Sequence, residues 1–386
     1  MRSVRLGIVT LYCWWLTGCV TTLQVQDAGD ELPLYDALFD GHSEVEVVSD
    51  KEIFALSEEA KAFVDAHISD HKNYETNISN LVYAIFDRAE MGLLYKGDAN
   101  SIARNTFLNR AANCLSLSIM TYAMADYAGF DAWFYEVDIP EYWTRRDGFS
   151  LLNGHINLRI TTPMELEITR LKDDFVDVDF DPQTIRKHFP RNRIKKDLVV
   201  AMFYNNRGAD AILKHDYDEA YAYFKAAANR APQLAQTWIN LGVLYRFKQA
   251  YDEAERSYHY ALAIDEDNLT GWENLAVLYR HNGQAEKARE IMASVDSQRR
   301  NNPFYHFILG EQALYEEKYA KAIQHYKQAK RLKKHHEIMF GLGKTYFAMG
   351  DISRARHYLE QAARYASNHQ DEKRYESKLT MLQSSR

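Results

Sequence analysis

The sequence has 386 residues, of which 46 % are hydrophobic and 26 % are charged. This composition is typical of a globular protein, and the length exceeds one typical domain, so we expect at least two domains. The formal net charge is −7. The acidic net charge argues against nucleic acid as a partner and against electrostatic attachment to a membrane surface.

The N-terminus carries a targeting pattern. Arg2 and Arg5 precede an apolar run over residues 6–16, which is typical of a secretory signal peptide and short for a membrane span. The run ends in Leu16-Thr17-Gly18-Cys19, which resembles the bacterial lipoprotein box. The resemblance implies cleavage before Cys19 and a lipid on this residue that anchors the chain to a membrane. The alternative is a generic secretory signal that leaves Cys19 as an ordinary thiol.

These expectations divide the start of the chain into a signal peptide, residues 1–18, and a tether, residues 19–49. Val20 follows the cysteine, which by resemblance to lipoprotein sorting rules implies the outer membrane, facing the periplasm. Cys13 would leave with the signal and Cys19 would carry lipid. Cys114 would then be the one free thiol of the mature chain, without a partner for an internal disulfide.

Cys114 falls at the predicted start of an apolar helix. Asn113 is a plausible N-cap, apolar residues recur at helical spacing, and the pattern ends at Gly129. The backbone N–H groups and the dipole at a helix start stabilise a thiolate, which is the nucleophilic form of cysteine. The alternative is that Cys114 is a small buried core residue, since free cysteine is often buried.

Three alternating segments follow this helix and predict an antiparallel sheet. The first covers residues 131–137, and the second places His155, Asn157 and Arg159 on one face of a strand. The third, residues 175–181, places carboxylates on one face and apolar side chains on the other. Helices before the cysteine would pack beside this sheet, which predicts an α+β domain over residues 50–197.

The order Cys, His, Asp, with the strings NCLSLS, GHINLRI and VDVDFD, resembles the transglutaminase-like fold of the papain-type thiol enzymes. The resemblance is closest to bacterial proteins that join such a domain to tetratricopeptide repeats. It implies Cys114 as the nucleophile, His155 as the base and Asp179 as the acid that orients the imidazole. Asp177 and Asp181 stay open as alternatives, because an error of one pleat exchanges them.

The implied chemistry is acyl transfer on a peptide or protein substrate. The thiolate of Cys114 would attack an amide carbonyl, and His155 would give a proton to the leaving amine and leave a thioester. Water would resolve the thioester in a protease or amidase, and an amine would do so in a transglutaminase; the residues leave both open. No cofactor or metal is implied. The alternative function is a non-catalytic envelope adaptor that works through its repeats.

From residue 198 onward the chain repeats itself. Two columns of small residues recur in steps of 34 residues, with 33 for the last step, and large side chains recur in register with them. This pattern resembles the tetratricopeptide repeat, whose paired helices need small residues where they cross closely. We expect about five repeats over residues 198–368 as an all-α superhelix, followed by a capping helix over residues 369–386. The columns are Gly208, Gly242, Ala276, Gly310 and Gly343, and Ala220, Ala254, Ala288, Ala322 and Ala355.

Polar residues also recur at equivalent positions of the first helices. Asn206, Asn240 and Asn274 form one set and Arg246 and Arg280 another, on the face that normally lines the concave surface of such an array. Amides can pair with an extended backbone and arginines with carboxylates, which predicts a groove for a protein or peptide partner. The alternative is that the asparagines only bond neighbouring helices and the arginines are solvated.

Overall fold

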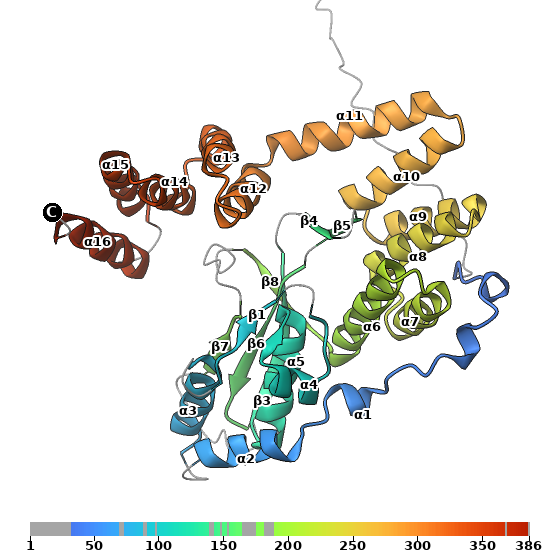
Figure 1. The fold of residues 1–386 in the computed structure, drawn as a ribbon, viewed down its shortest axis with the longest axis horizontal. Helices are drawn as coiled ribbons and strands as arrows, with labels where there is room; N and C mark the ends of the chain where they lie inside the picture. The colour runs from blue at the N-terminus through green and yellow to red at the C-terminus, as the bar shows by residue number, and fades with distance from the viewer. Residues whose placement is uncertain are drawn as a thin grey trace, which may run out of the picture.

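The computed structural model describes residues 32–68, 73–87, 91–96, 99–138, 143–146, 149–152, 154–163, 175–180, 189–366 and 369–384. The expected signal peptide, Cys19 with the first part of the expected tether, and Asp181 lie outside these ranges. Figure 1 shows a part with helices and strands, followed by an array of helices that arches beside and above it. The helices and strands of the first part precede α6, which opens the array.

The first described segment, residues 32–44, is named here the strap. It contains two short 3₁₀ helices, η1 (Asp36–Leu38) and η2 (His42–Glu44), and leads into α1 (Asp50–Ile53). Phe39 is completely buried and stacks on Tyr221 of the helical array, with ring centroids 4.3 Å apart. Part of the expected tether is therefore packed against the array.

Helices surround the cysteine. They are α2 (Glu58–His67), α3 (Tyr74–Phe86), α4 (Ala103–Asn109) and α5 (Cys114–Tyr127). The Ser57 hydroxyl accepts a hydrogen bond from the backbone N–H of Ala60 and so caps α2. The side chain of Asn113 caps α5 in the same way, accepting from the N–H of Ser116 at 2.8 Å. Polar residues ahead of apolar ones thus define where both helices begin.

The main sheet has four antiparallel strands in the order β7-β6-β3-β8. Their bounds are β3 (Asp131–Val137), β6 (Ile156–Thr161), β7 (Phe175–Val178) and β8 (Arg191–Ile194). β8 was not expected from the sequence. Two further pairs are small: β1 (Leu94–Tyr95) lies parallel to β2 (Ala111–Ala112), and β4 (Trp143–Arg146) forms a hairpin with β5 (Phe149–Leu152).

One face of the sheet is covered by α5. Phe134 of β3 pairs with Leu158 of β6, which in turn pairs with Val178 of β7, and all three side chains are buried. Tyr122 of α5 stacks on Phe134 with ring centroids 4.8 Å apart. This apolar layer holds the start of α5 at a fixed position relative to the strands.

The second part of the chain is built from five helix pairs and a last helix, and Figure 1 shows them following one another in an arch. The two helices of each pair contact one another, and the prediction of an all-α superhelix for this part of the chain is confirmed. The helices are α6 (Lys196–Leu213) and α7 (Tyr217–Arg230), α8 (Ala235–Phe247) and α9 (Tyr251–Ile264), α10 (Leu269–His281) and α11 (Ala285–Asn301), α12 (Pro303–Tyr315) and α13 (Tyr319–Leu332), α14 (His336–Ala348) and α15 (Ile352–Arg364), and α16 (His369–Ser384).

The column glycines lie where paired helices touch. A Cβ at Gly242 would be 2.4 Å from a ring carbon of Tyr258, and a Cβ at Gly208 would be 2.6 Å from the ring of Phe224. Both aromatic rings are completely buried. The ring of the second helix therefore occupies the space that a larger residue in the first helix would need, which explains why small residues recur at this position of each repeat.

The two parts of the chain also meet at a second place. Phe189, just before β8, packs edge-to-face on Phe304 of α12 with ring centroids 4.8 Å apart. At the other end of the array, Tyr375 and Leu382 of α16 are buried against the last repeat. The array is thus joined to the first part by the strap, by α6 and by the contact at Phe304.

Candidate thiol site and repeat surface

Cys114 is the first residue of α5 and is a free, buried thiol with 9 % of its surface exposed. The first backbone N–H groups of a helix have no acceptor within the helix, so they favour negative charge at its start. Asn113 takes one of these groups and leaves the N–H of Cys114 itself without a partner from its own helix. The position suits a thiolate and an oxyanion.

His155 and Asp179 lie at the same end of neighbouring strands. His155 precedes β6 and Asp179 follows β7, and these strands are antiparallel. The Nε2 atom of His155 is 2.9 Å from Oδ1 of Asp179, with the two side chains 0 % and 13 % exposed. The imidazole is therefore fixed by a carboxylate away from solvent.

The electrostatics of His155 involve both candidate partners. Burial alone would lower the pKa of His155, but hydrogen bonds to Asp179 and Cys114 outweigh burial and raise the pKa to about 9. With Nε2 facing Asp179, the other ring nitrogen, Nδ1, is the one left for the sulfur. The structure thus brings Cys114, His155 and Asp179 together, as an imidazolium held between a carboxylate and a sulfur.

The neighbouring carboxylate, Asp177, faces different partners. It accepts hydrogen bonds from Nε and Nη2 of Arg159 at 2.7 and 3.0 Å, and from Nη2 of Arg191 at 2.9 Å. These arginines lower the pKa of Asp177 although burial opposes them. Of the two described candidates for the orienting acid, Asp179 is the one beside His155, and Asp181 lies outside the described residues.

Some of the residues expected to line the groove of the array already bond other parts of the protein. Asn240 donates to Oδ1 of Asn205 at 2.9 Å, and Asn274 donates to the backbone of Thr270 at 2.9 Å. Both asparagines thus bond their own or a neighbouring helix, which is the alternative stated for them. Asn206 and Arg246 are half-buried, and Arg280 is exposed.

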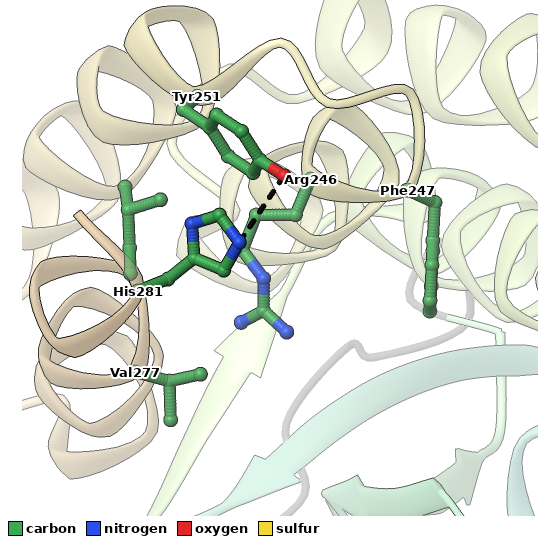
Figure 2. A pocket seen from close by; sticks show the side chains of 6 residues that line it. Arg246, Phe247, Tyr251, Val277 and His281 are labelled. Atoms are coloured by element: carbon green, nitrogen blue, oxygen red, sulfur yellow. Dashed lines mark hydrogen bonds between the residues drawn. The ribbon is translucent and has the colours of Figure 1, made fainter.

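A small pocket lies beside Arg246, between α8, α9 and α10 (Figure 2). Its volume is about 200 Å³. Arg246, Phe247, Tyr251, Val277, Leu278 and His281 line it. The hydroxyl of Tyr251 lies 3.3 Å from Nε2 of His281, and the guanidinium of Arg246 is 3.5 Å from Oδ1 of Asn274. The pocket combines an apolar wall with a cation, so it can take a small acidic side chain.

The sequence did not indicate that the strap contacts the helical array. The Tyr221 hydroxyl donates to Asp36 at 2.8 Å, and Lys225 donates to both oxygens of the same carboxylate at 2.8 Å. Tyr245 donates to the backbone of Pro33 at 2.9 Å. These partners are far apart in sequence, and no local pattern of the strap points to them.

Comparison with known proteins bears on the helical array. A family model described as tetratricopeptide repeat matches residues 248–306 and 313–382. The C-terminal part of the chain is a tetratricopeptide-repeat array. This confirms the repeats expected from the two columns, and such repeats indicate a protein-binding adaptor role. No curated protein matches the chain.

Solved structures with similar folds cover a little under half of the chain. A chain of the APC/C hetero-tetramer Cut9-Hcn1 has 18 % identity and a TM-score of 0.25, and the match covers 47 % of this chain and 36 % of that one. YrrB, titled a TPR protein with an unusual peptide-binding site, has 18 % identity and a TM-score of 0.24, with coverages of 46 % and 92 %. PilF of Pseudomonas aeruginosa has 17 % identity and a TM-score of 0.26, with coverages of 49 % and 94 %.

Within the residues that the structure describes, no helix combines the length and the apolar character that crossing a bilayer requires. The expected lipid site at Cys19 is not among them.

Proposed function

We propose that the chain binds a protein partner through its repeats and carries a thiol acyl-transfer site in its first domain. The repeat match supports the binding role. The observation that carries the thiol site is the 2.9 Å contact between His155 and Asp179 at a buried imidazole whose other partner is Cys114. The same arrangement supports the resemblance to transglutaminase-like thiol enzymes.

In the proposed reaction, the sulfur of Cys114 attacks an amide carbonyl of a protein or peptide. The imidazolium of His155 gives its proton to the leaving amine, and Asp179 keeps the ring in the tautomer and orientation that this transfer needs. The N–H of Cys114 stabilises the developing oxyanion from the helix start. A thioester on Cys114 remains, to be resolved by water in a protease or amidase or by an amine in a transglutaminase.

The thioester is the species to detect. The full chain is incubated with a small activated acyl ester, quenched in acid, and analysed by intact-mass and peptide mass spectrometry. We expect one acyl group on the peptide that contains Cys114, and none there in Cys114→Ala. Acylation of Cys114 at the same rate in the folded chain and in a urea-unfolded sample contradicts the proposal, because an activated thiol must depend on the fold.

The second candidate is an adaptor without chemistry, and the repeat comparisons favour it directly. In this case the first domain serves as a scaffold, and the pocket at Arg246 is the functional surface. The double variant Arg246→Glu, Arg280→Glu should then lose its co-purifying partners, whereas Cys114→Ala should retain them. Unchanged partners in the double variant, with the fold intact by circular dichroism, exclude this surface.

The proposed location is the bacterial envelope, with a lipid on Cys19 and attachment to the outer membrane facing the periplasm. The lipoprotein box in the sequence supports it. Replacement of Cys19 by Ser should leave unprocessed or non-membrane protein on fractionation. Retention of Cys19→Ser in the membrane fraction through acylation contradicts the assignment.

A further inference from the structure

The sheet face opposite α5 has an unusual surface, named here the arginine–aromatic face. The strand register places its residues opposite one another: Arg193 pairs with Tyr135, Arg191 pairs with Val137, and Trp133 pairs with Arg159. The face consists of Trp133, Tyr135, Arg159, Phe175, Arg191 and Arg193. Three cations and three rings therefore alternate across four neighbouring strands.

Each guanidinium on this face lies over a ring. Arg193 is 3.3 Å from the ring centroid of Trp133, Arg159 is 3.5 Å from that of Phe175, and Arg191 is 5.2 Å from that of Tyr135. Stacking of this kind holds the planar guanidinium in place by its face, so its N–H edge can still form hydrogen bonds. Arg159 and Arg191 already use part of this edge to bind Asp177. Such pre-ordering reduces the entropy lost when an anion binds.

The face remains open to solvent. Phe175 is 43 % exposed, and Arg191 and Arg193 are exposed residues. Asp177 neutralises Arg159 and Arg191 in part, while Arg193 has no carboxylate partner among the described residues. The patch therefore keeps a positive balance on a chain whose formal charge is −7. A local charge opposite to that of the whole molecule indicates a surface for an anion.

The position of the face connects it with the thiol site. Arg193, Tyr135 and Asn157 form one row across β8, β3 and β6. Arg159 pairs with Asp177, so the same register, continued by two residues, places Asn157 opposite Asp179. The carboxylate of Asp179 lies 2.9 Å from Nε2 of His155. The row of side chains thus runs from the guanidinium of Arg193 to the acid of the candidate triad.

We infer that the arginine–aromatic face binds an acidic, extended peptide segment and presents it to the thiol site. This inference rests on the proposed function and specifies its substrate class. Carboxylates of the segment bind the guanidinium edge of Arg193 and the part of the Arg191 edge that Asp177 does not occupy, and its apolar side chains cover Phe175 and the half-buried rings beside it. A peptide fits better than single-stranded nucleic acid, because the adjacent site is built to attack an amide and the chain as a whole is acidic.

The test measures binding of a fluorescein-labelled deca-glutamate peptide to the full chain by anisotropy at low salt. Arg193→Glu should weaken binding by about fivefold or more, and Arg193→Lys, which keeps the charge, should weaken it less. Arg289→Glu is the matched control, because Arg289 is an exposed arginine on α11 whose side chain is 71 % exposed. Added salt should weaken wild-type binding more than binding by Arg193→Glu.

Three results overturn the inference: equal effects of Arg193→Glu and Arg289→Glu, equal binding of deca-lysine, or preferential binding of a single-stranded DNA decamer. The proposed function is tested separately in the same samples. Cys114→Ala should bind deca-glutamate as the wild type does, and Arg193→Glu should keep its Cys114 reactivity. A wild-type chain that has a reactive Cys114 but does not bind deca-glutamate rejects the face alone, and a wild-type chain that binds deca-glutamate but has an inert Cys114 rejects the chemistry alone.

Discussion

Replacement of Gly242 by alanine tests the packing logic of the repeats. Alanine is favoured over glycine inside a helix by about 1 kcal/mol. The new Cβ, however, would lie 2.4, 2.7 and 2.8 Å from three ring carbons of Tyr258. Carbon atoms pack at about 3.5 Å or more, so the ring or the helix must move by roughly 1 Å.

The ring has no room to move, because Tyr258 is completely buried between paired helices. Overpacking of a core costs about 1–3 kcal/mol, and a rigid ring places this site near the upper end. After subtraction of the helix preference, Gly242→Ala should destabilise the repeats by about 2 kcal/mol. Gly343→Ala is the matched control: its Cβ would lie 3.2 Å from the flexible Leu359, so we expect little change or a small gain.

The assay is urea unfolding followed by far-ultraviolet circular dichroism, together with hydrogen exchange of α8 and α9. Exchange is needed because a repeat array can unfold in parts. Gly242→Ala should lower the unfolding midpoint and speed exchange in these two helices, and adding Tyr258→Leu should recover part of the loss. A Gly242→Ala chain as stable as Gly343→Ala would refute the reasoning.

Three further predictions follow from the structure. Asp179→Asn should slow alkylation of Cys114 because it misorients His155. Asp177→Asn affects only the contacts with Arg159 and Arg191, so it should leave the alkylation rate unchanged. Equal effects of the two variants contradict Asp179 as the acid that orients His155. Phe39→Ala, which empties a fully buried site, should expose the strap to protease, while Asp40→Ala at an exposed position should not; an uncut strap in Phe39→Ala contradicts the docking. The fold raises the pKa of His155 from 6.5 to about 9, so protonation of His155 stabilises the folded chain fully below pH 6.5, and this stabilisation is lost as the pH rises towards 9. The urea midpoint of the wild type should therefore fall between pH 6.5 and 9 more than the midpoint of His155→Gln does. Parallel pH profiles of the two chains contradict this prediction.

The sequence predicts local features of the fold well. The start of α5 follows from Asn113 as a cap ahead of an apolar run, and the structure has this cap. The repeats follow from glycines that recur in register with large rings, and the contact between Gly242 and Tyr258 is the physical cause of this recurrence. Both signals lie within short stretches of chain, where helix chemistry alone decides the outcome.

Features that depend on distant partners are harder to predict. The strap has no periodicity, and Asp36 is held by Tyr221 and Lys225 from the other part of the chain. β8 is short and mostly charged, so its sequence alone does not indicate a strand. The choice between Asp177 and Asp179 needs the strand register and also Arg191, which lies on that unexpected strand and holds Asp177.

The central claim, that the fold activates Cys114, is tested most directly by alkylation at pH 6. Iodoacetamide is added to the folded full chain and to His155→Ala, and the rate at Cys114 is followed by peptide mass spectrometry. An ordinary thiol with a pKa near 8.5 is only about 0.3 % thiolate at this pH. The account predicts rapid alkylation of Cys114 in the wild type and a rate lower by about tenfold or more in His155→Ala. Slow and equal rates in both chains, with reaction only after unfolding in urea, would contradict it and leave the repeat adaptor as the function.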